Sequence, residues 1–229
     1  MTAAAKPFTG VIDLHHGDTT VNVRALVQGG VRAVIHKATE GQDFRDKSFA
    51  RMTERLRAER LLIGAYHFAN GNGDGADQAE HLLRTVGADA ERTLLALDWE
   101  ANPTSRYGDM TRENAQRFVE RIHARTGRWP LLYSFTSYLR EHLGPETVDP
   151  VLKNCPLWQA QFGERPRAPA SRTWARIALW QYTNGHDGPA DQTTYTRRTA
   201  GCELDPCQDR SAFDGTEAEL AAWWTTAGR

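Results

Sequence analysis

The chain has 229 residues, a net charge of −1, 40% hydrophobic residues and 25% charged residues. This composition is typical of a soluble globular protein, and the absence of a basic block argues against nucleic acid as a partner. The length exceeds the ~150 residues of a typical domain, but α/β barrels of this size form single domains, so we expect one domain over residues 1–229.

The N-terminal segment lacks the apolar stretch of a Sec signal, and the chain contains no run of about 20 apolar residues, so membrane insertion is not expected. Three cysteines do not make a disulfide framework. Cys202 and Cys207 are close enough to pair across a loop, which leaves Cys155 over, but the spacing alone does not decide whether they do. The spacing also lacks the paired cysteines of a zinc site, so no metal and no other cofactor is expected.

Apolar runs alternate with amphipathic segments through the first two thirds of the chain. The expected strands are 8–13, 31–37, 61–68, 93–98 and 130–134. The expected helices are 23–28, 48–60, 77–86, 111–126 and 137–143. A polar loop is expected at 38–41, and a Gly/Asn/Asp loop at 70–75.

Helices become rare after residue 143. Two further strands are expected at 155–160 and 177–182, and a short eighth strand within 201–209. Thr216-Glu-Ala-Glu219 is a capping box that predicts a final helix over 216–227. Five strand–helix units followed by three strands favour a parallel sheet closed into an eight-stranded barrel, with a core over about 10–215. The fold class is therefore α/β, an irregular TIM-like barrel.

A barrel of this kind carries its chemistry at the C-terminal ends of its strands. Nearly every expected strand delivers a polar or aromatic residue to that end. These residues are Asp13, His15, His16, Lys37, Glu40, Tyr66, His67, Asp98, Glu100, Tyr133, Ser134, Trp158, Gln159, Gln181 and Tyr182. Chance would scatter such residues over both ends of the barrel, so the pattern indicates one functional rim.

The fourth strand ends in two carboxylates, Asp98 and Glu100, separated by Trp99. Side chains two residues apart on a strand point the same way, so the two acids should lie side by side. Two like charges this close raise the pKa of at least one acid and keep it protonated near neutral pH. A strand that ends in Asp-x-Glu more often caps a helix or binds a surface arginine, but the shared rim favours a functional pair.

The sequence resembles the glycoside hydrolase family 25 lysozymes, the Chalaropsis-type N-acetylmuramidases. The matching motifs occur in family order over about residues 10–215, nearly the whole chain. They are Gly10-Val-Ile-Asp13 with His15-His16, Val34-Ile-His-Lys-Ala-Thr-Glu-Gly41, Ile63-Gly-Ala-Tyr-His-Phe68, Gln78-Ala79, Leu97-Asp-Trp-Glu100, Leu157-Trp-Gln-Ala160, Leu179-Trp-Gln-Tyr182 and Asp209-x-Ser211-x-Phe213. Two features depart from the family pattern. One is the Leu-His-His-Gly segment that follows Asp13, and the other is the serine at position 211.

The resemblance implies a (β/α)5(β)3 barrel and cleavage of the β-1,4 bond between N-acetylmuramic acid and N-acetylglucosamine in peptidoglycan. It also implies four catalytic acids: Glu100, Asp98, Asp13 and Asp209. Glu100 matches the general acid of the family. Asp209 matches the acid near the last strand, where Asp205 and Asp214 are nearby alternatives.

Two mechanisms fit these acids. Asp98 attacks the anomeric carbon directly, or the 2-acetamido group of the substrate attacks while Asp98 orients and stabilises it. A direct double displacement needs two carboxyl groups on opposite faces of the sugar, ~5 Å apart. Carboxyl groups two residues apart on one strand lie on the same side, which favours substrate assistance.

Further rim residues are expected to bind substrate. They are Tyr66, His67, Tyr133, Trp158, Gln181 and Lys37. Each of the Trp158-Gln159 and Trp180-Gln181 pairs should place one side chain in the core, and we expect Trp158 and Gln181 to face the substrate. Packing at the top of the barrel is an equal alternative for the tyrosines, and an ion pair is an alternative for Lys37.

Two other classes of function remain: a metal-dependent phosphodiesterase that uses rim histidines and acids, and a non-catalytic glycan-binding protein. The expected partner is the peptidoglycan glycan strand, with an immunity or inhibitor protein as a further partner, and the chain is expected to be a monomer. It should act at the bacterial cell wall, in the periplasm or outside the cell. Without a Sec signal, delivery would use another export route or release by a phage.

Overall fold

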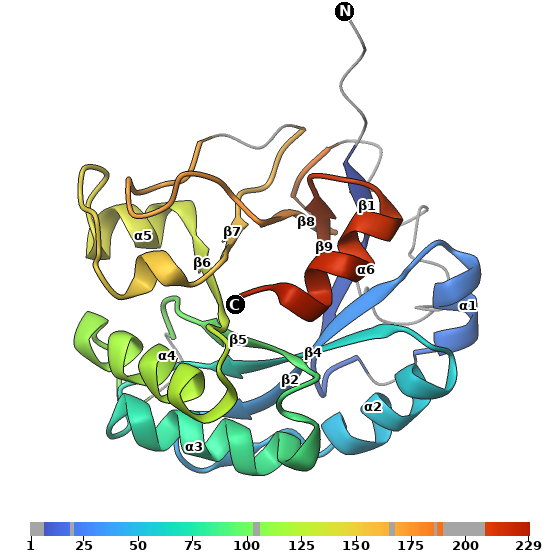
Figure 1. The fold of residues 1–229 in the computed structure, drawn as a ribbon, viewed down its shortest axis with the longest axis horizontal. Coiled ribbons are helices and arrows are strands. Elements are labelled where there is room, and N and C mark those ends of the chain that lie inside the picture. Colours follow the sequence, from blue (N-terminus) through green and yellow to red (C-terminus); the bar gives the residue numbers. More distant parts are fainter. Residues whose placement is uncertain (1–6, 19–20, 103–105, 165–167, 186, 190–208) are drawn as a thin grey trace, which may run out of the picture.

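The computed structural model describes residues 7–18, 21–102, 106–164, 168–185, 187–189 and 209–229 (Figure 1). The strands are β1 (Phe8–Leu14), β2 (Ala33–Glu40), β3 (Phe44–Arg45), β4 (Leu62–Phe68), β5 (Leu94–Asp98), β6 (Leu131–Phe135), β7 (Leu157–Ala160), β8 (Leu179–Asn184) and β9 (Asp209–Phe213). The α-helices are α1 (Val23–Gln28), α2 (Phe49–Ala58), α3 (Gly75–Val86), α4 (Arg112–Thr126), α5 (Thr136–His142) and α6 (Glu217–Thr226).

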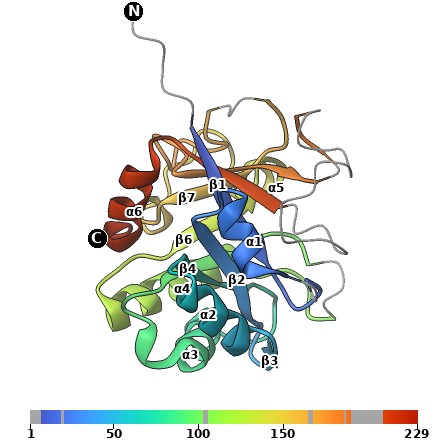
Figure 2. The ribbon, with the colours of Figure 1, turned by 90° about the vertical axis from the view of Figure 1, so that its right-hand side faces the viewer.

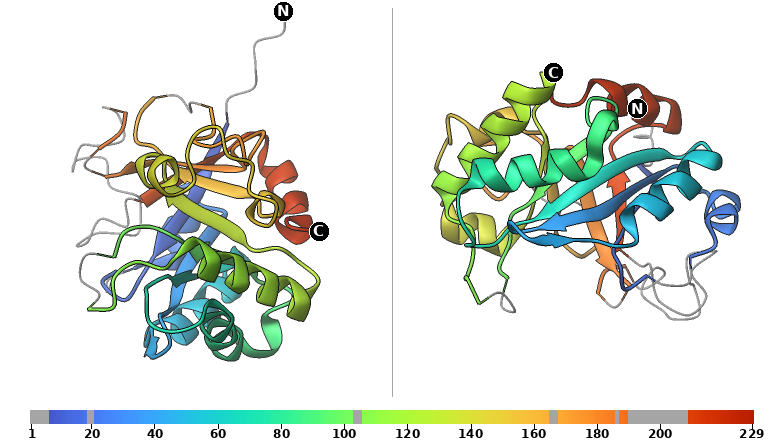
Figure 3. Two further views of the ribbon diagram at one scale, coloured as in Figure 1. Left: turned by 90° about the vertical axis from the view of Figure 1, so that its left-hand side faces the viewer. Right: turned by 90° about the horizontal axis from the view of Figure 1, so that it is seen from below.

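Eight strands form a closed barrel in the order β1-β2-β4-β5-β6-β7-β8-β9, and β9 pairs back onto β1. Figure 2 shows β1 beside the C-terminal strand at this seam. An α-helix follows each of the first five barrel strands, whereas within the described residues no α-helix separates β7, β8 and β9, so the expected five units and three strands are confirmed. Helices α3 and α4 pack against each other outside the barrel (Figure 3).

The last strand corrects the expectation of an all-parallel barrel. β9 begins at Asp209 instead of lying within 201–209, and it runs antiparallel to both β1 and β8. Its first residue, Asp209, pairs with Asn184, which is the last residue of β8. Reversal of the strand therefore brings its beginning to the rim where the parallel strands end.

Residues 38–40 also differ from the expected loop, because β2 continues to Glu40. The additional strand β3 pairs antiparallel with this end of β2, with Thr39 opposite Arg45 and Glu40 opposite Phe44. The resulting hairpin stands at the same rim of the barrel.

The side chains that point into the barrel change from apolar to polar along its axis. Along β5, Leu94 and Ala96 point inward below Asp98, as the alternation of a strand requires. The inner core contains Val11, Ala33, Ile35, Leu94, Ala96, Leu131, Tyr133, Trp158, Leu179, Phe213, Leu220, Trp224 and Ala227. Leu220 and Trp224 belong to α6, which therefore closes the lower end and leaves the polar upper end open.

Local signals set the helix ends as expected. Thr216 accepts a hydrogen bond from the backbone of Glu219, whose side chain accepts one from the Thr216 backbone, which completes the capping box of α6. Thr111 caps α4, and Gly127 ends it at φ 69°, a left-handed conformation that glycine adopts without strain. Within the described residues, no helix combines the length and the apolar character needed to cross a membrane.

Candidate active site

A cavity of about 420 Å³ opens at the polar end of the barrel. Its walls come from all eight barrel strands and from the segments that follow several of them. The lining residues are Asp13, His15, His16, Lys37, Tyr66, Phe68, Asp98, Glu100, Tyr133, Phe135, Trp158, Phe162, Gln181, Asn184 and Asp209. The cavity therefore unites residues that are up to 196 positions apart in the sequence, from 13 to 209.

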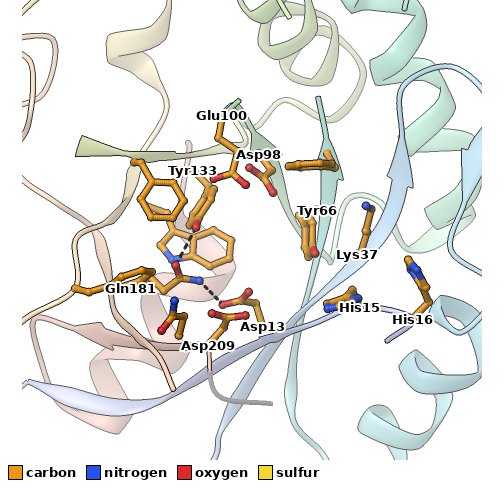
Figure 4. Close-up of a pocket in the computed structure, with 15 residues that line it drawn as sticks. Asp13, His15, His16, Lys37, Tyr66, Asp98, Glu100, Tyr133, Gln181 and Asp209 are labelled. Carbon is orange, nitrogen blue, oxygen red and sulfur yellow. Dashed lines mark hydrogen bonds between the residues drawn. The ribbon is translucent and has the colours of Figure 1, made fainter. Parts of the chain in front are cut away.

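Asp98 and Glu100 lie next to each other on one side of this cavity (Figure 4). β5 ends at Asp98, but the strand-like alternation continues, since Trp99 is fully buried behind the wall and Glu100 points into the cavity again. Backbone hydrogen bonds fix the segment on both sides: Ala69 N donates to Asp98 O at 2.9 Å, and Trp99 N donates to Tyr133 O at 2.9 Å. The two acids are thus held in place by the sheet.

Asp13 and Asp209 lie together on the opposite side of the cavity (Figure 4). Asp13 comes from β1, and the antiparallel β9 delivers Asp209 beside it. The alternative Asp214 is exposed and does not line the cavity, while Asp205, Cys202 and Cys207 lie outside the described residues. The cavity is therefore bounded by two pairs of acids that face each other.

A hydrogen-bonded relay positions Asp13. The Tyr133 hydroxyl donates to Gln181 Oε1 at 2.8 Å, and Gln181 Nε2 donates to Asp13 Oδ2 at 3.0 Å. The relay crosses from β6 through β8 to β1. Gln181 lines the cavity, and because both ends of its amide are hydrogen-bonded within the protein, it also orients the Asp13 carboxylate.

The environment raises the pKa of all four acids. Burial, followed by the charge of Asp209, raises the pKa of Glu100 from 4.5 to about 7, while Lys37 lowers it. Burial and then the neighbouring Glu100 raise the pKa of Asp98 well above its usual range. Burial and then Asp209 do the same for Asp13, and burial and then Asp18 raise the pKa of Asp209 to about 7. A carboxylic acid that keeps its proton near neutral pH is suited to donate it.

Two carboxylate oxygens in the cavity have no hydrogen-bond partner among the described residues: Asp98 Oδ1 and Glu100 Oε2. Buried polar atoms are nearly always paired, and exceptions need a physical reason. Since both atoms belong to the same acid pair, the reason that fits is a bound molecule that supplies the missing partners.

Lys37 places a cation beside the Asp98 and Glu100 pair. Its Nζ donates to Glu40 Oε2 at 2.7 Å and lies 4.6 Å from the centroid of the Phe68 ring. The other Glu40 oxygen accepts from Asn102 Nδ2 at 3.1 Å. We expected Lys37 either to bind substrate or to form an ion pair. In the structure it forms an ion pair with Glu40 and also lines the cavity.

The pH dependence of activity should follow from these charges. The family resemblance implies that Glu100 is a general acid, which must be protonated to act, so with its pKa at about 7 we expect kcat to fall as the pH rises through 7. Lys37 lowers this pKa, so Lys37→Met should move the alkaline limb of the kcat profile to higher pH. Lys153→Met, which removes an exposed lysine outside the cavity, is the matched control and should leave the profile in place. A limb that stays fixed in Lys37→Met would contradict this assignment.

Five of the six expected substrate-binding residues line the cavity: Tyr66, Tyr133, Trp158, Gln181 and Lys37. His67 does not, and its expected role needs correction. It is fully buried, its Nδ1 lies 2.8 Å from Thr39 Oγ1, and its Nε2 lies 2.8 Å from Gln78 Oε1. Burial is the largest cause that lowers its pKa to about 3, so the ring stays neutral. Adjacent residues of a strand face opposite sides, and Tyr66 already occupies the inner one.

Sequence reasoning missed four lining residues: Phe68, Phe135, Phe162 and Asn184. Phe68 and Phe135 follow Tyr66 and Tyr133 by two positions, so the alternation that identified the tyrosines could have found them. Phe162 lies beyond the end of β7, where no strand periodicity applies.

Two histidines lie at the cavity wall, but among the described residues no three His, Cys, Asp or Glu side chains gather in a way that could hold a metal ion. His15 and His16 line the cavity, with ring centroids 5.3 Å apart. His16 Nδ1 lies 3.3 Å from Asp46 Oδ2, a carboxylate that also accepts from the His16 backbone at 2.8 Å. This pair therefore orients the imidazole at the cavity wall.

Comparison with known proteins places this site in a family. The model of "Glycosyl hydrolases family 25" matches residues 12–189. Lysozyme M1 of Streptomyces globisporus is 30% identical over 222 residues, which cover 92% of this chain and 69% of that protein. The autolytic lysozyme of Clostridium acetobutylicum is 27% identical over 79% of this chain, and the chain spans only 53% of its length. The solved bacterial lysozyme of Streptomyces coelicolor superimposes with a TM-score of 0.77 at 27% identity, over 97% of this chain and 99% of that one.

Proposed function

The chain belongs to glycosyl hydrolases family 25, and on that premise we propose that it is a lysozyme of the N-acetylmuramidase type. It would hydrolyse the β-1,4 bond between N-acetylmuramic acid and N-acetylglucosamine in peptidoglycan. The observation that carries the proposal is the cavity at the barrel rim, where Glu100, with a pKa of about 7, stands beside Asp98 and across from Asp13 and Asp209. Relatives named lysozyme support the same activity.

Glu100 acts as the general acid in this proposal. The glycosidic oxygen is a poor leaving group unless it gains a proton as its bond to the anomeric carbon breaks. Glu100 donates that proton and is left as a carboxylate. In the second step the same carboxylate takes a proton from the incoming water, which returns the enzyme to its starting state.

The 2-acetamido group of N-acetylmuramic acid is the nucleophile that the geometry favours. Asp98 and Glu100 stand on one side of the cavity, whereas a direct double displacement needs carboxyl groups on opposite faces of the sugar. The acetamido oxygen attacks the anomeric carbon, and the free Asp98 Oδ1 accepts the acetamido N–H. Asp98, Asp13 and Asp209 also stabilise the positive charge that develops on the ring and the acetamido group.

The substrate and the site of action follow from the activity. In this proposal the partner is the peptidoglycan glycan strand and the chain acts at the bacterial cell wall. We also propose that the protein is delivered by a non-Sec export route or by phage release, and that an immunity or inhibitor protein controls it.

The test is loss of turbidity of purified peptidoglycan with and without EDTA. We expect equal clearing in both, because protonation by Glu100 needs no metal. Activity that is lost in EDTA and restored by a divalent cation would favour the phosphodiesterase alternative. Binding to the peptidoglycan without clearing would favour the glycan-binding alternative.

A further inference from the structure

Two exposed aromatic rings stand at the rim that carries the cavity. Among the described residues, three large hydrophobic side chains are exposed: Phe44 at 40%, Tyr107 at 41% and Val148 at 56%. Phe44 follows β2 and Tyr107 follows β5, so both lie on segments at the C-terminal ends of barrel strands. Exposed apolar groups that gather at one place mark a binding surface more often than scattered ones do.

The ring of Phe44 is continuous with the cavity wall. Its centroid lies 5.3 Å from Lys37 Nζ and 5.5 Å from the centroid of the His16 ring. Both neighbours line the cavity on the side away from Gln181 (Figure 4). The backbone is fixed as well, since Phe44 pairs with Glu40 of β2 and its carbonyl accepts a hydrogen bond from His81 Nε2 at 2.9 Å.

Hydrogen bonds connect the segment of Phe44 to the segment of Tyr107. Asn72 Nδ2 donates to Asp43 Oδ2 at 3.2 Å, and Gly71 N donates to the carbonyl of Gly108 at 2.8 Å. The segment after β4 thus lies between the other two and is tied to both. The three segments form one continuous edge beside the cavity.

Tyr107 is held at this edge by Arg106. The guanidinium lies 4.7 Å from the centroid of the Tyr107 ring and donates to its hydroxyl. This hydrogen bond is the largest cause that raises the pKa of Arg106, and the carboxylate of Asp43, next to Phe44, raises it further.

We propose that Phe44 and Tyr107 form an aromatic platform that binds a sugar residue of the glycan strand beyond the catalytic cavity. Aromatic rings offer large, rigid apolar faces that pack against the C–H face of a pyranose at a small cost in conformational entropy. The platform deepens the proposed function and rests on it, because only a polymeric substrate extends past the cleavage site. Its expected ligand is an extended β-1,4-linked amino-sugar strand.

The test compares long and short substrates. For the double variant Phe44→Ala/Tyr107→Ala, the ratio of kcat/KM on long glycan strands to kcat/KM on a tetrasaccharide of the same repeat should fall about tenfold, as expected for the loss of two aromatic contacts. Phe44→Tyr and Tyr107→Phe keep the rings and should retain the ratio of the unchanged protein. Val148→Ala, on the connection from α5 to β7, removes an exposed apolar group elsewhere and should also retain it.

Two outcomes would overturn the platform. An equal loss on both substrates would mean that the rings support only the fold or the cavity, and thermal unfolding of each variant identifies a loss of fold. No loss on either substrate would mean that the exposed rings do not contact the strand.

Sedimentation with purified peptidoglycan separates this inference from the proposed function. In the Glu100→Gln background, Phe44→Ala/Tyr107→Ala should reduce the fraction of protein bound to the polymer, and unchanged binding would contradict the platform. A chain that binds through both rings but, with Glu100 intact, cleaves nothing would refute the proposed function and leave the platform standing.

Discussion

Glu100→Gln is expected to lower kcat on purified peptidoglycan by about 10²–10⁴-fold, with a much smaller change in KM. The amide matches the carboxyl group in size but cannot give a proton to the glycosidic oxygen or take one from water. Burial and the charge of Asp209 raise the pKa of Glu100 to about 7, so near neutral pH a substantial fraction of the side chains removed by this substitution carry a proton. Initial rates of release of reducing ends, measured over a range of substrate concentrations, separate kcat from KM.

The matched control for this prediction is Glu113→Gln. Glu113 is exposed in the first turn of α4 and lies outside the cavity, so its substitution should leave the rate unchanged. If Glu100→Gln kept a tenth or more of the activity of the unchanged chain, Glu100 would not be the general acid.

The second large effect is expected for Asp98→Asn, which should lower kcat by about 10²–10³-fold. The substitution keeps the shape of the side chain but replaces an acid, which can ionise as the acetamido group attacks, with an amide that stays neutral. Asp98 Oδ1 has no hydrogen-bond partner among the described residues, so the effect should arise with the substrate and not from a lost contact within the protein. Thermal unfolding of Asp98→Asn, compared with the unchanged chain, tests that the fold is retained.

Inhibitors distinguish the two possible roles of Asp98. Under substrate assistance, a bicyclic thiazoline that mimics the cyclised acetamido group should inhibit the unchanged chain. A fluorosugar should leave no covalent adduct on Asp98, as judged by mass spectrometry of the intact protein and its peptides. An inactive thiazoline together with a trapped adduct would instead establish Asp98 as the nucleophile.

The barrel was predictable because most of its signals are local. Apolar runs predicted the strands, and amphipathic segments predicted the helices. The capping box formed by Thr216 and Glu219 predicted the last helix. β9 was not located correctly, since its direction depends on pairing with β1 and β8, which are distant in sequence. The extension of β2 over 38–40 was missed for a similar reason, because the short partner strand β3 carries no periodic pattern.

The site shows the same division between local and distant information. Alternation along β5 was enough to place Asp98 and Glu100 side by side. The same alternation predicts that His67 faces away from the cavity, because its neighbour Tyr66 faces inward. We expected His67 to bind substrate because it is polar, and this expectation was wrong. The relay from Tyr133 through Gln181 to Asp13 joins three strands, and no spacing in the sequence reveals it.

The most direct measurement of the central claim is the chemical identity of the new reducing ends. Purified peptidoglycan is digested with the unchanged chain, reduced with borohydride and analysed by mass spectrometry. We predict that the new ends are reduced N-acetylmuramic acid and that Glu100→Gln releases none above background. New ends that are reduced N-acetylglucosamine, or none at all with the unchanged chain, would contradict the assignment as a muramidase.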